Sequence, residues 1–114
     1  MRNHRKMKAF ELADNFVLSV YRETKAWPND ERFGLTSQVR RASVSIASNI
    51  VEGCARESER EYLRFLEIAY SSAREVAYQL SLARRLDMPV STQLESQVDE
   101  CCRVLYTMHK RGVE

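Results

Sequence analysis

The stretch LTSQVRRASVSIASNIVEGCAR, which runs from Leu35 to Arg56, decides the fold of this chain. Between Ala42 and Val51 it carries no charged residue, although 30% of the chain is charged. On a helical projection, small and apolar side chains cover well over half of the circumference, namely Val39, Ala42, Val44, Ile46, Ala47, Ile50, Val51, Gly53 and Ala55. A helix that is apolar on nearly every side is buried on nearly every side. Because a chain of 114 residues has too few helices to cover one of its own so completely, we expect this helix to form both the monomer core and the contact with other copies.

A narrow polar strip remains on this helix, made of Arg41, Ser45, Ser48, Asn49 and Glu52. Short uncharged side chains allow another helix to approach closely, and Asn49 and Glu52 could form hydrogen bonds across such a contact. We therefore predict an oligomer interface at Ser45, Ser48, Asn49 and Glu52. The alternative interpretation is that the strip lines a ligand pocket.

The composition indicates one globular domain over residues 1–114, with a basic arm at residues 1–5. The apolar content is 44%, which is typical of folded proteins, and the net charge of +2 does not by itself predict a nucleic-acid ligand. No apolar run approaches the roughly 20 residues of a membrane span, and the polar N-terminus predicts no signal peptide. Three cysteines without a C-x-x-C spacing favour reduced thiols and a cytoplasmic location.

Apolar residues at helical spacing predict one further helix before the central one and another after it. The first spans about residues 6–27 and ends before Pro28, because the residue preceding a proline disfavours the α conformation. The second opens at the capping box Ser58-x-x-Glu61 and runs to about Leu86.

A second capping box, Thr92-x-x-Glu95, opens the last helix, which Gly112 closes. The chain therefore carries four amphipathic segments joined by short links. Such a pattern predicts an all-α, antiparallel four-helix bundle.

Residues that could catalyse a reaction or hold a metal are not spaced to do so. Metal centres in helical bundles use Glu-x-x-His pairs, and neither His4 nor His109 follows a glutamate at that spacing. His109 instead follows Tyr106 by three residues. No histidine lies in a segment that looks buried, so no base is expected beside a serine or cysteine nucleophile. We predict a protein that is not an enzyme and that needs no metal or cofactor.

Arginines supply the candidate binding site for nucleic acid, with the N-terminal arm as an auxiliary. The candidate residues are Arg40, Arg41, Arg56, Arg60 and Arg64. A guanidinium donates two parallel hydrogen bonds to a phosphate, which gives affinity without sequence preference. The structural alternative is that Arg40 and Arg41 form a solvated helix end, or ion pairs with Glu52 or a neighbouring subunit.

Aromatic residues that could stack on bases are less clearly marked. Tyr62 and Phe65 belong to the apolar stripe of the helix that follows Ser58. Tyr70 and Tyr78 lie off that stripe and could equally be interface residues.

Three consecutive motifs carry a family resemblance. They are P-x-x-E-x-F-G-L from Pro28 to Leu35, Q-V-R-R-A-S-x-S-I-x-x-N-I-x-E-G from Gln38 to Gly53, and R-E-S-E-R-E-Y-L-R-F-L-E-I-A-Y-S-S-A-R-E from Arg56 to Glu75. With these motifs the chain resembles the 23S ribosomal RNA intervening-sequence proteins from its first helix to its last. Cys54 departs from the family pattern, which has another small or polar residue at that position.

The resemblance implies a four-helix monomer that assembles into a closed ring of five, with no catalytic residues. The family is also similar in fold to the accessory variability determinant proteins of diversity-generating retroelements, whose implied role is a scaffold for nucleic acid and a reverse transcriptase. We therefore expect a homopentamer that binds RNA or DNA. The alternative is a protein-binding scaffold, for example for a polymerase, with no direct contact to nucleic acid.

Overall fold

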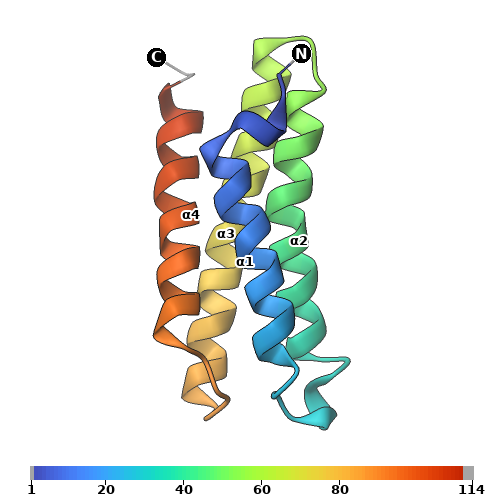
Figure 1. Cartoon of the computed structure of the whole chain (residues 1–114), viewed down its shortest axis with the longest axis vertical. Coiled ribbons are helices and arrows are strands. Elements are labelled where there is room, and N and C mark those ends of the chain that lie inside the picture. The colour runs from blue at the N-terminus through green and yellow to red at the C-terminus, as the bar shows by residue number, and fades with distance from the viewer. Residues whose placement is uncertain (1, 112–114) are drawn as a thin grey trace.

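Four long helices form an antiparallel bundle with up-down-up-down topology (Figure 1). The computed structural model describes residues 2–111, which span 43 × 21 × 20 Å. The helices are α1 (Lys8–Thr24), α2 (Leu35–Cys54), α3 (Glu59–Arg85) and α4 (Thr92–Arg111), with short 3-10 helices η1 (His4–Lys6) and η2 (Asn29–Glu31). Helices α1 and α3 each pack against both α2 and α4. The predicted all-α four-helix bundle is thus confirmed, and the expected helix end at Gly112 lies outside the described residues.

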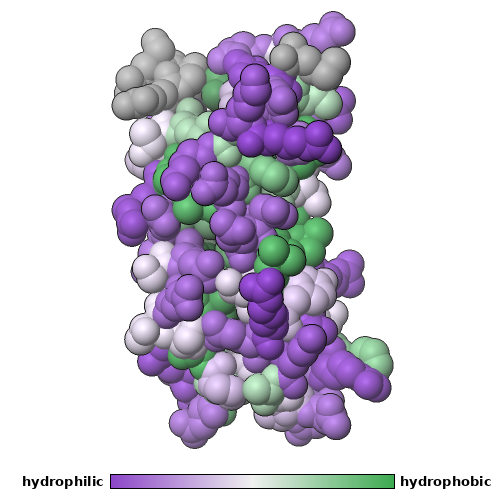
Figure 2. All heavy atoms as spheres, in the orientation of Figure 1, coloured by the Kyte–Doolittle hydropathy of each residue, from purple (hydrophilic) through white to green (hydrophobic). Residues whose placement is uncertain are grey.

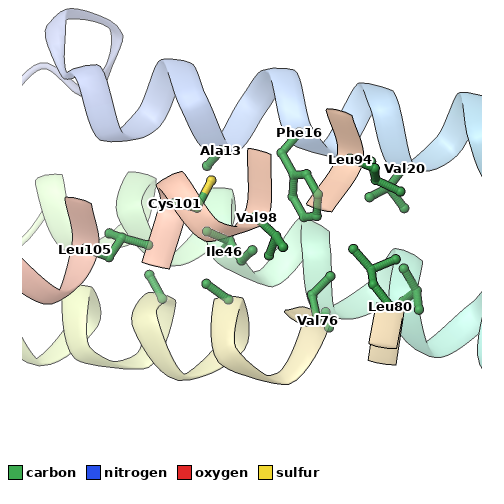
Figure 3. Close-up of a cluster of buried hydrophobic side chains, with 14 of the residues drawn as sticks. Ala13, Phe16, Val20, Ile46, Val76, Leu80, Leu94, Val98, Cys101 and Leu105 are labelled. Carbon is green, nitrogen blue, oxygen red and sulfur yellow. The ribbon is translucent and has the colours of Figure 1, made fainter. Parts of the chain in front are cut away.

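One apolar core runs through the bundle and receives side chains from every helix (Figure 3). The ring of Phe16 from α1 lies among Ile46 of α2, Val76 of α3 and Val98 of α4, and all four side chains are buried. Five of the small and apolar residues of α2 are also buried, namely Val39, Ala42, Ile46, Ile50 and Gly53. Hydrophilic side chains cover most of the face shown in Figure 2, where hydrophobic residues appear as separate patches. Among the described residues, no helix combines the length and the apolar composition needed to cross a bilayer.

The C-terminus of α1 and the N-terminus of α3 follow local sequence signals. Helix α1 ends at Thr24, a few residues before the limit predicted from Pro28, and a turn joins Trp27 N to Thr24 O at 3.1 Å. The hydroxyl of Ser58 accepts a hydrogen bond from Glu61 N at 3.0 Å, which confirms this residue as the N-cap of α3.

Helix α3 ends in a Schellman motif. The amide of Met88 donates to Ala83 O and the amide of Asp87 donates to Arg84 O, both at 3.0 Å. Asp87 has a φ of 63°, in the left-handed region that aspartate tolerates better than most side chains. The helix therefore stops at Arg85, before Pro89 can interrupt it.

Helix α4 begins with a cap that differs from the predicted one. The hydroxyl of Ser91, not of Thr92, accepts from the backbone amide three residues ahead, Leu94 N, at 3.0 Å. The carboxylate of Glu23, from the end of α1, accepts from Ser91 N at 3.2 Å and from Ser91 Oγ at 2.6 Å. Glu23 therefore takes the part that Glu95 would play in a local capping box, and Glu95 pairs with Arg84 instead.

The only tryptophan of the chain strengthens the same junction. Trp27 is buried, and its indole Nε1 donates to Pro89 O at 2.8 Å. The end of α1 is thus hydrogen-bonded to the loop that connects α3 to α4 at two neighbouring points.

Helices α2 and α3 approach closely at Gly53. A Cβ atom placed on Gly53 would lie 2.9 Å from Phe65 Cβ and 3.3 Å from the backbone oxygen of Tyr62. Both residues belong to α3. Neither atom can move without shifting the helix. Only glycine fits at this position.

We predict that Gly53→Ala lowers the free energy of unfolding by about 1–2 kcal/mol, because the added methyl overpacks the α2–α3 contact more than it improves helix propensity. Thermal and denaturant unfolding followed by circular dichroism would measure the loss. Ser71→Ala, on the exposed side of α3, is the control and should change stability by no more than about 0.5 kcal/mol. Unchanged or increased stability of Gly53→Ala would contradict the close contact.

Candidate nucleic-acid interface

Within one chain the five candidate arginines fall into two groups. Arg40 and Arg41 lie near the start of α2, whereas Arg56, Arg60 and Arg64 lie around the α2–α3 turn and the first turns of α3. Residues 41 and 54 of α2 alone are separated by about 20 Å, given about 1.5 Å of rise per residue. A single chain therefore does not bring the five together on one surface.

Arg40 is used largely within the bundle. Its Nε donates to Thr24 Oγ1 at 2.8 Å, and its guanidinium carbon lies 4.8 Å from the centroid of the Tyr21 ring. The side chain is half-buried, so it ties α2 to α1. Arg41 is exposed on the other side of α2, beside Ser45 and Glu75. Arg40 is thus neither a solvated helix end nor ion-paired with Glu52 within the described residues, whereas Arg41 is open to solvent.

The second group is more accessible. Arg56, Arg60 and Arg64 are all exposed, and the Arg56 guanidinium lies 4.7 Å from the centroid of the Phe65 ring. Arg60 and Arg64 line a groove of about 380 Å³ together with Glu61, Leu63, Glu67 and His109. Within residues 2–111, none of these three arginines forms an ion pair. Their guanidinium groups can therefore take an external anion, although Glu61 and Glu67 share the groove with Arg60 and Arg64.

The N-terminal arm docks at the same end of the bundle. Arg2 N donates to Cys54 O at 3.0 Å, and the Arg2 guanidinium lies 3.6 Å from the centroid of the Tyr62 ring, where it also pairs with Glu59. The pairing occupies Arg2, whereas the neighbouring Arg5 is exposed. The arm thus adds basic charge close to the turn that carries Arg56.

The four residues predicted at an oligomer interface differ in how they are used. Ser45 Oγ is 2.9 Å from Ser72 Oγ of α3, and Asn49 Nδ2 donates to Ser45 O at 2.8 Å. These two side chains therefore form hydrogen bonds inside the chain, whereas Ser48 and Glu52 are exposed. Part of the apolar surface of α2 is also exposed to solvent, since Val44 is 39% exposed.

An aromatic cluster between α3 and α4 was not predicted as a site. The ring centroid of Tyr70 lies 5.6 Å from that of Tyr106 and 5.1 Å from that of His109, and the last two lie 5.6 Å apart. The inference that no histidine lies in a buried segment was wrong, because His109 is 8% exposed and its Nδ1 lies 3.1 Å from Leu105 O. The signals for this cluster were the three-residue spacing of Tyr106 and His109 and the position of Tyr70 beside the core stripe.

The cysteines are poor nucleophiles. Burial raises the pKa of the Cys101 thiol to about 12, and burial also raises the pKa of Cys54 and Cys102. The Cys54 thiol donates to Met7 Sδ at 3.2 Å. Among residues 2–111, no group of three or more His, Cys, Asp or Glu side chains is placed to hold a metal ion.

Comparisons with known proteins agree with this architecture. The sequence model of the 23S rRNA-intervening sequence protein family matches residues 5–109. A solved structure of a protein with unknown function from the S23 ribosomal protein family of Bacteroides thetaiotaomicron is 24% identical and superposes with a TM-score of 0.81. The alignment covers 90% of this chain and 95% of that chain, and at this identity it shows the shared fold alone. No curated protein matches the chain.

We predict that iodoacetamide labels Cys102 before Cys101 and Cys54 in the native protein at about pH 8. Cys102 is half-buried, whereas the other two thiols are buried, and a pKa of about 12 leaves roughly one Cys101 thiol in ten thousand ionised at that pH. Mass spectrometry of the alkylated peptides would give the order, which should disappear in denaturant. Equal native labelling of Cys101 and Cys102 would be incompatible with the described burial.

Proposed function

The chain belongs to the 23S rRNA-intervening sequence protein family, and on that premise we propose that it is a non-enzymatic protein that binds RNA or DNA through basic side chains. The observation that supports this proposal most directly is the group formed by Arg56, Arg60 and Arg64. All three are exposed, and none has a carboxylate partner within residues 2–111. Neither the matched family nor the solved relative indicates an enzyme.

The chemistry of these arginines suits a phosphate backbone. A guanidinium offers a planar pair of donors that matches two phosphate oxygens. Contacts of this kind position a protein on nucleic acid but do not read its sequence, and they weaken steeply as salt rises. The proposed activity is therefore binding with little sequence preference, in the cytoplasm, where three unpaired cysteines remain reduced.

The proposed assembly is a ring of five chains. Its support is the family resemblance together with the exposed part of α2, where Val44 and Ser48 face solvent in a single chain. Apolar surface that one chain leaves open is typical of a contact between copies. In a ring, the arginines of each chain would be repeated around the assembly and would bind a long polyanion at several points.

A protein-binding scaffold is the second candidate function. Its support is Phe33, which is 86% exposed, together with Tyr78 at 61% and Leu86 at 55%. Large exposed hydrophobic side chains are common at sites where proteins dock. In that case the partner would be a protein such as a polymerase, and the arginines would maintain solubility.

We predict that the double variant Arg60→Ala/Arg64→Ala binds both a structured RNA and a duplex DNA more weakly than the wild type, with the same loss for each. The slope of log affinity against log salt, between about 50 and 200 mM, should fall by roughly one for each phosphate contact removed. Fluorescence anisotropy would measure both quantities.

A matched control is Arg22→Ala/Arg85→Ala, which removes the same charge from exposed arginines at the opposite end of the bundle. Its affinity should stay close to the wild-type value. If both double variants lose affinity equally, net charge rather than this arginine group determines binding. If the wild type binds neither nucleic acid at low salt, the scaffold is the better account.

We predict that Ser48→Arg disrupts the assembly, because it places a long charged side chain on the exposed face of α2 where another helix would approach. Light scattering after gel filtration should give a mass of five chains for the wild type and a smaller mass for the variant. Ser96→Arg on α4 is the control. A wild-type mass of one chain at micromolar concentration would refute the ring.

A further inference from the structure

The aromatic cluster between α3 and α4 lies at the edge of the core and is only partly buried. Tyr106 is 47% exposed, and Tyr70 is only partly buried beside it. Within residues 2–111 neither tyrosine hydroxyl takes part in a hydrogen bond with the protein, although His109 is held at Leu105 O. Two helices therefore present a group of packed rings with one large aromatic face open to solvent.

Grooves lie on both sides of this cluster. One, of about 370 Å³, is lined by Tyr70, Arg74, Cys102, Arg103, Tyr106 and Thr107. The other is the groove of about 380 Å³ that reaches from His109 to Arg60 and Arg64. Both volumes lie within the range of small-molecule sites, which begins at about 300 Å³. The rings thus stand between two hollows of the surface.

Basic side chains flank the rings. Arg74 and Arg103 lie close enough to Cys102 to lower the pKa of its thiol, against the larger effect of burial. Neither arginine forms an ion pair within the described part of the chain. The ammonium group of Lys110 lies 5.7 Å from the centroid of the Tyr106 ring. Positive charge is therefore available at both ends of the ring cluster.

Acidic side chains near the grooves are fewer than the basic ones. Glu61 and Glu67 line the groove beside His109, and Asp99 lies close enough to Cys102 to raise the pKa of its thiol. The groove of Tyr70 and Tyr106 is lined by two arginines and by no carboxylate. An anionic ligand with a flat apolar part matches this arrangement best.

We propose that the cluster of Tyr70, Tyr106 and His109 is a stacking site for unpaired bases of single-stranded nucleic acid. A base would stack on the exposed ring of Tyr106, while Arg74 and Arg103 contact the phosphates on one side and Arg60 and Arg64 those on the other. Stacking on aromatic rings combined with basic side chains along a groove is the usual chemistry of single-strand binding. Residues 64 and 74 of α3 are about 15 Å apart, a span that suits a few nucleotides.

The rings distinguish a single strand from a duplex. In a duplex the faces of the bases are covered by neighbouring base pairs, so an aromatic ring on the protein adds little to binding. Unpaired bases can turn outward and stack on the protein. This inference rests on the proposed function and assigns it a preference for unpaired segments. Apolar grooves also accept a second copy of a chain, and the experiment below distinguishes that occupant.

The test compares Tyr106→Ala with the wild type by fluorescence anisotropy, using a labelled (AC)n RNA of about 12 nucleotides, which cannot self-pair, its DNA counterpart, and RNA duplexes of the same length. Tyr106→Ala should weaken binding of both single strands about tenfold or more and leave duplex binding within about twofold. The salt slope should not change, because no charge is removed. Tyr106→Phe should retain wild-type affinity, since stacking needs the ring and not the hydroxyl.

The control is Tyr78→Ala, which removes an exposed tyrosine of α3 that lines neither groove, and it should bind as the wild type does. Equal binding of single strands by Tyr106→Ala and the wild type would overturn the inference while leaving the proposed function intact. An equal loss for single strands and duplexes would overturn it too. A wild type that binds no nucleic acid would remove the proposed function itself. A change in assembly mass for a folded Tyr106→Ala would assign the groove to a second copy instead.

Discussion

The close contact between α2 and α3 is the constraint on which the rest of the bundle depends. At Gly53 there is no room for even a methyl group, because Phe65 Cβ and Tyr62 O already lie at contact distance. Farther along the same seam, the hydroxyls of Ser45 and Ser72 meet at 2.9 Å, which also requires short side chains. Once the two helices are fixed in this way, the neighbouring side of α3 faces α4. The small residues of α2 thus determine which side chains of α3 line the second seam.

The same packing gives the two ends of α2 different uses for their arginines. Near its start, the guanidinium of Arg40 donates a hydrogen bond to Thr24 and lies over the Tyr21 ring, so it stabilises the contact with α1. Beyond its end, Arg56 and Arg60 project into solvent. The sequence alone does not separate these roles, because an arginine that bonds within the bundle and one that faces solvent are the same residue type. Their roles differ because a neighbouring helix supplies an acceptor at one end and not at the other.

The sequence predicted those parts of the structure that depend on local signals. The apolar spacing gave the four helices, and Ser58 marked the start of α3 to the residue, since its partner lies only three positions away. The start of α4 was misplaced by one residue because Glu23, far away in the sequence, completes the cap of Ser91. The cluster of Tyr70, Tyr106 and His109 was missed for the same reason. It exists only where α3 and α4 lie side by side, and no single helical pattern contains it.

The hydrogen bond between Trp27 and Pro89 gives the protein a spectroscopic property of its own. Trp27 is the only tryptophan, it is buried, and it sits where the end of α1 meets the α3–α4 loop. Tyr106 lies about 20 Å farther along α4, given about 1.5 Å of rise per residue from Thr92. Tryptophan fluorescence, excited at a wavelength that tyrosine does not absorb, therefore monitors the junction of α1 with that loop and hardly senses events at Tyr106. The packing of this junction can consequently be followed by fluorescence in the unlabelled protein.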